Sequence, residues 1–252
     1  MSTVSPIVVP WASQYYASGM QEGPDAVLAE LGASAAVRVA VPDLEGALAG
    51  TAEAVARAEG LPLALLGECS LVPGFAAGAV RRHADACLVW IDAHGDLNTP
   101  GSSQTGFIGG MPFAVIVGWW GDEQRAACGF AGLEEQRCAL VGARDLDPGE
   151  ASMLAGSQIV SCDGVADALA SLPADVPLIV HLDGDILDPG VAPGVDVPAP
   201  DGWDVERLRN EIALLAASGR VTAVSLCCGN PRKDIEGRSA RAYLDGLAPL
   251  LV

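Results

Sequence analysis

The chain alternates short apolar runs with longer amphipathic stretches. The short runs are rich in Val, Ile and Leu, as buried strands are, whereas the longer stretches repeat apolar residues at helical spacing. The predicted strands lie at residues 7–10, 36–41, 62–66, 86–91, 138–142, 158–161, 177–182 and 221–226. The predicted helices lie at 43–59, 72–83, 163–172 and 203–218. This alternation predicts a mostly parallel α/β sheet with helices on both faces.

Length and composition are consistent with one folding unit. Half of the 252 residues are apolar, which is enough to bury a large core. No Pro- or Ser-rich linker, internal repeat or low-complexity segment interrupts the pattern. We therefore expect a single domain over residues 1–252.

The charge balance excludes two classes of partner. The chain has 32 acidic and 14 basic residues, a formal net charge of -18 that repels nucleic acids and anionic membranes. No apolar run approaches the roughly 20 residues of a membrane-spanning helix, and the N-terminus lacks a signal-type pattern. The seven cysteines form no C-x-x-C pair, so reduced thiols are expected. We predict a cytoplasmic protein that binds neither nucleic acid nor membrane.

Acidic residues follow the predicted strand at 86–91. Asp92, His94 and Asp96 come directly after it at intervals of two residues. In extended backbone, side chains two residues apart share a face, so we expect these three to point the same way.

A second acidic cluster follows the predicted strand at 177–182. Asp183 and Asp185 are again two residues apart, and Asp188-Pro189 closes the turn. Ligands of parallel sheets bind beyond the carboxyl ends of strands, and carboxylates that converge there repel one another unless cations neutralise them. Oxygen ligands with one imidazole suit Mn²⁺ or a similar ion. The alternative, that these residues cap helices or begin turns, explains a lone D-x-D better than it explains two clusters.

Together these blocks resemble the arginase and agmatinase (ureohydrolase) superfamily. The matching runs are Asp92-Ala93-His94-Gly95-Asp96 and Asp183-Gly184-Asp185 with Asp188-Pro189, supported by Gly23-Pro24, Asn98-Thr99-Pro100, residues 141–150 and Ala192-Pro193-Gly194. The resemblance implies a three-layer α/β/α fold with an eight-stranded sheet. It also implies two Mn²⁺ ions that activate water for attack on a guanidinium carbon, and a trimeric or hexameric homo-oligomer.

Cys69 departs from the family pattern, which carries a metal-ligating His at this position. A thiolate there adds negative charge and favours softer ions. Buried cysteines are usually inert, which is our interpretation of Cys87, Cys138 and Cys162, but for Cys69 we favour ligation. The same Cys, with the run Thr105–Met111, resembles a hydroxyarginine-hydrolase branch of the superfamily. The implied metal ligands are Cys69, Asp92, His94, Asp96, Asp183 and Asp185.

Two more departures concern the substrate. Gly109 replaces the His that shuttles a proton in arginases, and Cys228 replaces the Glu that holds the guanidinium. A cation without that carboxylate binds poorly, so a less basic hydroxyguanidine, which also offers a better leaving group, suits this site. We take Asp96 and His181 as the candidate catalytic residues, with His181 as the substitute proton carrier.

The family resemblance also implies residues for an amino-acid substrate. Asn98 and Thr105 match positions that bind the α-carboxylate, and Asp147 and Glu150 match positions that bind the ammonium group. The alternative is that Asp147, Pro148 and Glu150 form an ordinary helix N-terminus, and both interpretations can hold.

The leading hypothesis is a metal-dependent amidinohydrolase. It would cleave the guanidine C–N bond of an arginine-like or N-hydroxyarginine-like amino acid, giving urea or hydroxyurea and an ornithine-type amine. One alternative is hydrolysis of another C–N substrate, such as a guanidino acid, formimino compound or amide. A second is a degenerate binding protein, which the intact costly carboxylates argue against. A third is a Cys227 or Cys228 nucleophile, for which no partner His is evident.

Overall fold

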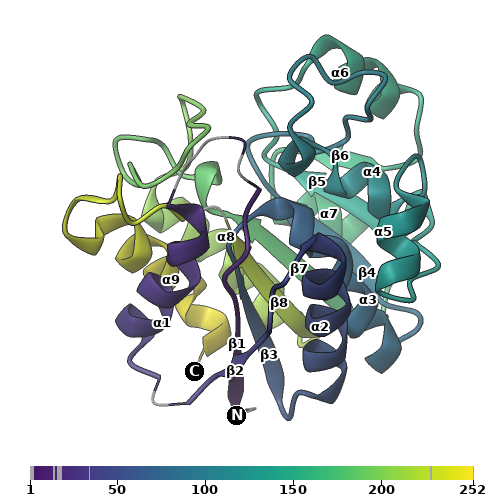
Figure 1. Cartoon of the computed structure of the whole chain (residues 1–252). Coiled ribbons are helices and arrows are strands. Elements are labelled where there is room, and N and C mark those ends of the chain that lie inside the picture. The colour runs from purple at the N-terminus through teal and green to yellow at the C-terminus, as the bar shows by residue number, and fades with distance from the viewer. Residues whose placement is uncertain (1–2, 14, 16–18, 34, 228, 252) are drawn as a thin grey trace.

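The computed structural model is built around one eight-stranded sheet, and it describes residues 3–13, 15, 19–33, 35–227 and 229–251 (Figure 1). The strands are β1 (Val4–Val9), β2 (Val37–Arg38), β3 (Leu61–Leu66), β4 (Cys87–Ile91), β5 (Cys138–Val141), β6 (Val160–Cys162), β7 (Leu178–Asp183) and β8 (Val221–Cys227). Their order is β2-β1-β3-β8-β7-β4-β5-β6, and each pair of neighbours is parallel. The predicted fold class and all eight predicted strands are confirmed.

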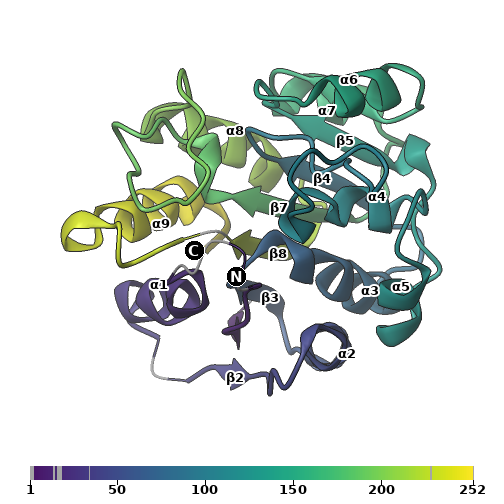
Figure 2. The same ribbon diagram turned by 45° about the horizontal axis from the view of Figure 1, so that its top comes forward.

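The central strands are apolar on both faces because helices cover both sides of the sheet. Leu88 and Trp90 of β4 pack into one core cluster, and Val89 and Ile91 pack into the other. The first cluster is covered by α2 (Leu44–Arg57), α3 (Val72–Arg82) and α4 (Pro112–Ile116), with α5 (Asp122–Ala127) outside them. The second is covered by α1 (Gly23–Leu31), α7 (Val165–Ser171), α8 (Val205–Ala217) and α9 (Arg238–Leu251). These layers form the three-layer sandwich of Figure 2.

The four predicted helices are present as α2, α3, α7 and α8. Asp43 begins α2 by accepting a hydrogen bond from Gly46 N (2.7 Å), and Asp204 begins α8 by accepting one from Arg207 N (2.7 Å). Helices α1, α4, α5 and α9 were not predicted from the sequence. Gly23-Pro24 opens α1 and Pro249 lies within the last turn of α9, so residues that usually break helices mark both elements.

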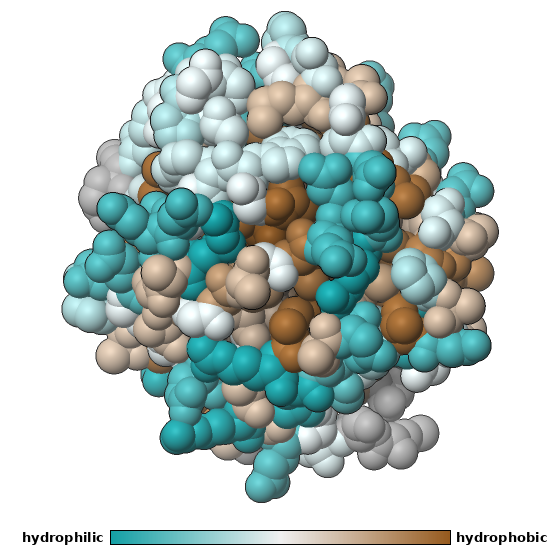
Figure 3. All heavy atoms as spheres, turned by 90° about the vertical axis from the view of Figure 1, so that its right-hand side faces the viewer, coloured by the Kyte–Doolittle hydropathy of each residue, from teal (hydrophilic) through white to brown (hydrophobic). Residues whose placement is uncertain are grey.

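All strands end toward the top of Figure 1, where α6 (Pro148–Ala155) and the longest loops gather. Figure 3 shows the surface of the molecule on the side of α2, α3 and α5, where patches of apolar residues are separated by hydrophilic residues. Within the described part of the chain, no helix combines the length and apolar character needed to cross a membrane.

Candidate metal centre and substrate pocket

Four neighbouring strands bring potential ligands to one edge of the sheet. Cys69 follows β3 at the start of the 3-10 helix η2 (Cys69–Leu71), and Cys227 is the last residue of β8. Asp183 is the last residue of β7, and Asp92 directly follows β4. Because β3, β8, β7 and β4 are adjacent in the sheet, residues far apart in sequence meet at their carboxyl ends.

The residues after β4 do not continue the strand, so the prediction that they share one extended face is wrong. The chain bends at Ala93 and His94, and Asp96 adopts a left-handed conformation with φ of 50°. The carbonyl of Asp96 accepts a hydrogen bond from Phe113 N (2.9 Å) at the start of α4, which helps to hold this conformation. The bend sends His94 and Asp96 to different sides of Asp92, so that they belong to different ligand groups.

The second acidic pair also leaves the extended conformation. Asp185 lies in the 3-10 helix η5 (Gly184–Ile186), and its backbone N–H donates to Asp183 Oδ1 (2.9 Å). The other oxygen, Asp183 Oδ2, accepts from the Cys69 thiol (2.8 Å). The two carboxylates therefore still reach the same pocket, but through a turn rather than along a strand.

Among the residues that the structure describes, potential ligand atoms form three overlapping groups, each with members within 4.8 Å of one another. The groups are Asp92, His94 and Asp185; Cys69, Asp92 and Asp96; and Cys69, His181, Asp183 and Cys227. The first two together contain five of the six residues predicted as ligands, and the third contains the sixth, Asp183. Asp92 joins the first two groups, as expected of a residue between two neighbouring cations.

The electrostatics of the first group indicate a cation between its carboxylates. Burial and the charge of Asp185 raise the pKa of Asp92, because both disfavour a second buried anion. Burial opposes protonation of His94, but hydrogen bonds with Asp185 and Asp92 outweigh it and raise the pKa of His94 to about 12. His94 Nδ1 lies 3.0 Å from Asp185 Oδ2, so its proton takes the place that a metal cation would take. The residues thus fit a divalent ion.

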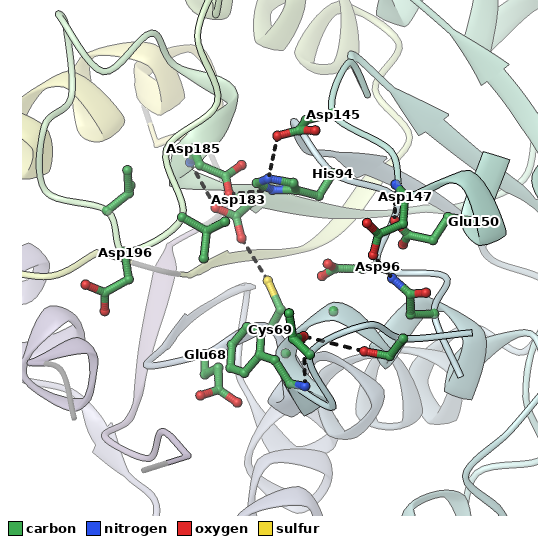
Figure 4. Close-up of a pocket in the computed structure, with 18 of the residues that line it drawn as sticks. Glu68, Cys69, His94, Asp96, Asp145, Asp147, Glu150, Asp183, Asp185 and Asp196 are labelled. Carbon is green, nitrogen blue, oxygen red and sulfur yellow. Dashed lines mark hydrogen bonds and ion pairs between the residues drawn. The ribbon is translucent and has the colours of Figure 1, made fainter. Parts of the chain in front are cut away.

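Most of the predicted site residues line one cavity of about 230 Å³ (Figure 4). They are Cys69, His94, Asp96, Asn98, Thr105, Asp147, Glu150, Asp183 and Asp185, and Gly109 lines the same cavity. In Figure 4, Cys69 points toward Asp183, while Asp96, Asp147 and Glu150 lie on the opposite side. The volume is small beside the roughly 300–1,000 Å³ typical of pockets for drug-sized ligands, and it suits a small metabolite.

Comparison with known proteins places these features in one family. A model of the arginase family matches residues 4–250 of the chain. The chain belongs to the arginase family.

N(omega)-hydroxy-L-arginine amidinohydrolase from Streptomyces lavendulae is 33% identical over 220 residues, 84% of this chain and 78% of the relative. Arginase from Brucella melitensis is 31% identical over 210 residues, 77% and 69% of the two chains. The crystal structure of arginase from Bacillus subtilis matches with a TM-score of 0.88 at 26% identity, covering 99% and 98%. The predicted superfamily is confirmed.

Hydrogen bonds tie the predicted substrate residues to one another. Asn98 Nδ2 donates to Asp147 Oδ2 (3.0 Å), which orients that carboxylate. Glu150 accepts from Asp147 N (3.0 Å) and from Leu97 N (2.9 Å), so it connects the start of α6 to the loop after β4. Burial raises the pKa of Glu150. The helix-start interpretation is therefore correct for Asp147 and Glu150, and both also line the pocket of this arginase-family protein.

A phenylalanine ring covers Gly109, where arginases carry the proton-shuttling His. A Cβ built on Gly109 would lie 2.2 Å from Phe107 Cζ, so any side chain there requires Phe107 to move. Phe107 also contacts Tyr15, with ring centroids 5.2 Å apart. This wall of the pocket is aromatic rather than titratable. Cys228, at the position of the guanidinium-binding Glu, lies outside the described residues.

His181 is fully buried in β7 and does not line the cavity. Its ring packs 4.1 Å from that of Trp90, and burial lowers its pKa to about 4. Its Nε2 lies 3.7 Å from Cys69 Sγ and 3.8 Å from Cys227 Sγ. The sequence showed no His partner for Cys227, but the fold supplies one. This placement favours a ligand or positioning role for His181 over proton transfer to a substrate.

Sequence reasoning missed several acidic residues of the pocket. Glu68 is buried and accepts from Ser13 N (2.8 Å) and Ser70 Oγ (2.8 Å). Asp145 Oδ2 lies 3.8 Å from His94 Nε2, and Asp196 pairs with Lys233 Nζ at 2.6 Å. The position of Glu68 next to Cys69 was the one signal in the sequence. Asp145 and Asp196 lie in loops without periodicity, and only the fold brings them to the pocket.

Proposed function

We propose that this chain hydrolyses the guanidine C–N bond of an arginine-like amino acid and prefers an N-hydroxyguanidine over a plain guanidine. The products would be hydroxyurea, or urea from the plain substrate, and an ornithine-type amine. The observation that carries the preference is the aromatic wall at Gly109, where Phe107 takes the space of the family's proton-shuttling His. The resemblance to an N(omega)-hydroxy-L-arginine amidinohydrolase supports the same choice.

The metal-binding part of the pocket would hold two divalent ions. Asp92, His94 and Asp185 offer carboxylate oxygens and one imidazole, which suit Mn²⁺. The second ion would be held on the Cys69 side of Asp92. Two such ions, when bound, supply a water molecule of lowered pKa and a polarised environment for the guanidine carbon.

The acidic residues far from β7 would orient the substrate. Asp147 is held by Asn98 and faces the pocket, so it can accept hydrogen bonds from an α-ammonium group. Glu150 supports that position through the backbone of Asp147, because its two oxygens accept the N–H groups of Asp147 and Leu97. Asn98 and Thr105 would bind the α-carboxylate. An amino acid anchored at both ends would present its guanidine carbon to the metal-binding residues.

A hydroxyguanidine suits the remaining features of the pocket. Its oxygen withdraws electron density, so the group is less basic than guanidine and can enter neutral. Contrary to the expectation from the sequence, hydroxylation does not change the leaving group, because the ornithine-type amine departs whether hydroxyurea or urea forms. The neutral group further tolerates Cys228 in place of a carboxylate, because no full cation must be matched there.

The test is a turnover assay on Mn²⁺-loaded protein with arginine, N-hydroxyarginine, agmatine and guanidinobutyrate. Urea and hydroxyurea are quantified separately, and Asp92→Asn serves as the inactive control. We expect hydroxyurea from N-hydroxyarginine at a higher kcat/KM than urea from any plain guanidine. Turnover confined to guanidinobutyrate or another non-amino-acid substrate would contradict the proposal, as would folded, metal-loaded protein with no turnover.

A further inference from the structure

Two cysteines, one histidine and one aspartate meet at the edge of the pocket, where Cys69 and Asp183 line it and His181 and Cys227 lie behind them. We propose that Cys69, His181, Asp183 and Cys227, here named the thiol site, bind a thiophilic divalent cation, with Zn²⁺ as the preferred ion. The inference rests on the proposed function only for the presence of a metal centre at this edge of the sheet. It assigns ligand roles to Cys227 and His181 and predicts an unequal pair of ions, one bound by thiolates and one by carboxylates.

The distances are those of a site close to tetrahedral. Zinc binds sulfur at about 2.3 Å and nitrogen or oxygen at about 2.0–2.2 Å, so tetrahedral ligand atoms lie about 3.3–3.8 Å apart. His181 Nε2 lies 3.7 and 3.8 Å from the two sulfurs, and Cys227 Sγ lies 3.3 Å from Asp183 Oδ2. The two sulfurs are 2.9 Å apart and Cys69 Sγ is 2.8 Å from Asp183 Oδ2. These two separations need to widen by less than about 1 Å to admit the ion.

Adjacent strands hold the ligands in place. His181 and Asp183 are two residues apart in β7 and so project from the same face, and Cys227 of β8 pairs directly with Asp183. Cys69 follows β3, on the other side of β8. All four side chains are almost completely buried, from 0 to 3% exposed. Ligands fixed by a sheet and shielded from water form a preorganised structural type of site.

The imidazole and the carboxylate are oriented from behind. His181 Nδ1 lies 2.9 Å from Ser225 Oγ. In the tautomer that metal binding requires, Nδ1 would donate to this hydroxyl and the lone pair of Nε2 would face the ion. Asp183 Oδ1 accepts from Asp185 N (2.9 Å), and Oδ2 is left to face the thiols. Supporting hydrogen bonds of this kind set the tautomer and orientation of metal ligands.

The chemical types of the ligands determine which metal ion the site prefers. Thiolates select softer cations, and two thiolates with a neutral imidazole and one carboxylate favour Zn²⁺ over Mn²⁺. The group Asp92, His94 and Asp185 contains no sulfur and keeps its preference for harder ions. The alternative state of these two thiols is a disulfide between Cys69 and Cys227, which forms only if an external oxidant such as dioxygen or another disulfide takes up two electrons and two protons, and which would release the ion. Thiol counts distinguish these two states.

Cobalt(II) provides a spectroscopic test that needs no substrate. The full-length protein is reduced, stripped of metal with a chelator and titrated with Co²⁺, and the sulfur-to-cobalt charge-transfer band and the visible bands are recorded. Zn²⁺ is then added to displace Co²⁺, and bound metal is measured by plasma mass spectrometry. The variants are Cys227→Ala, Cys227→Ser and, as a matched control, Cys138→Ala, whose thiol is equally buried in β5 but lies in none of the ligand groups.

We expect a strong charge-transfer band that Zn²⁺ abolishes, roughly halved in both Cys227 variants and unchanged in Cys138→Ala. Zn²⁺ affinity should fall in the Cys227 variants by more than the roughly 10- to 100-fold typical of losing an outer-shell partner. Co²⁺ binding without the band, or an equal band in Cys227→Ser, would overturn the proposal. So would two missing thiols in the protein as purified and denatured without reductant. The band with no turnover would instead count against the proposed function alone.

Discussion

Asp92 belongs to two of the three ligand groups. It is almost fully buried, accepts from Trp90 Nε1 (2.8 Å) and His94 N (2.7 Å), and has a pKa raised by burial and by Asp185. Such a carboxylate is held in place at a cost that a bound cation removes. Asp92 therefore destabilises the folded protein without metal and stabilises it when metal is bound.

Asp92→Asn should separate these two effects. Without metal, the variant should melt a few degrees above the wild type, since removal of about 1 kcal/mol of repulsion shifts Tm by roughly 2–4 °C in a chain of this size. With Mn²⁺, only the wild type should gain stability, and the variant should lose at least about 100-fold in kcat/KM. Thermal melts with and without Mn²⁺ check this. An equal gain from Mn²⁺ in both proteins would show that Asp92 is not a ligand.

Phe107 and Gly109 determine whether this wall of the pocket can carry a side chain that transfers a proton. Gly109→His alone should not confer arginine turnover, because the new side chain meets the Phe107 ring at its Cβ. Gly109→His combined with Phe107→Ala should raise kcat/KM for arginine by roughly 10-fold or more, since general acid catalysis contributes about 10²–10⁴. Steady-state urea assays compare these variants with Phe107→Ala alone. A gain in the Gly109→His single variant would show that the ring does not block this position.

At the scale of elements, α6 and the loop after β4 are coupled through one carboxylate. Glu150 accepts two backbone N–H groups, one from each segment, and is 4% exposed. Loss of both bonds leaves buried donors unsatisfied, so Glu150→Ala should lower the free energy of unfolding by about 2–3 kcal/mol. Glu150→Gln, which keeps one acceptor oxygen, should cost less.

Urea denaturation measures these losses, with Glu206→Ala as the control. Glu206 is also in the first turn of a helix, α8, but it is exposed and should cost no more than about 0.5 kcal/mol. Both Glu150 variants should also raise KM for the amino-acid substrate, because Asp147 loses its support. An unchanged KM in Glu150→Ala would show that the support of Asp147 at the start of α6 is not needed for substrate binding.

At the scale of the whole molecule, the acidic pocket links stability to pH. The pKa of His94 rises from an ordinary 6.5 to about 12 in the folded protein. A group whose pKa is higher in the folded than in the unfolded protein stabilises the fold fully at pH values below its unfolded pKa. This contribution of His94 is lost as the pH rises from about 6.5 toward 12. The metal-free protein should therefore lose up to about 1.4 kcal/mol per pH unit between pH 7 and 9 through this group.

Denaturation of the metal-free protein at several pH values tests this linkage. His94→Asn should lack this part of the slope, and saturation with Mn²⁺ should remove it from the wild type, because the metal displaces the proton. A slope that persists unchanged in His94→Asn would assign it to other groups. Sedimentation at the same protein concentrations tests the predicted trimer or hexamer.

The sequence predicted the sheet well because buried parallel strands appear as continuous apolar runs, and β3, β4, β7 and β8 all do so. It also placed Asp92 and Asp183 correctly, since each comes directly at a strand end. It failed where the chain turns. The left-handed Asp96 and the 3-10 helix at Asp185 depend on contacts with distant segments, and the meeting of Cys69 with Cys227 depends on strand order.

We propose that this arginase-family protein acts on a hydroxyguanidine in preference to a guanidine. The most direct measurement is a competition in which Mn²⁺-loaded protein receives equimolar arginine and N-hydroxyarginine and the two products are followed together. The ratio of initial rates gives the ratio of kcat/KM. We predict that hydroxyurea forms faster than urea. Urea formed as fast as hydroxyurea, or faster, would contradict the account.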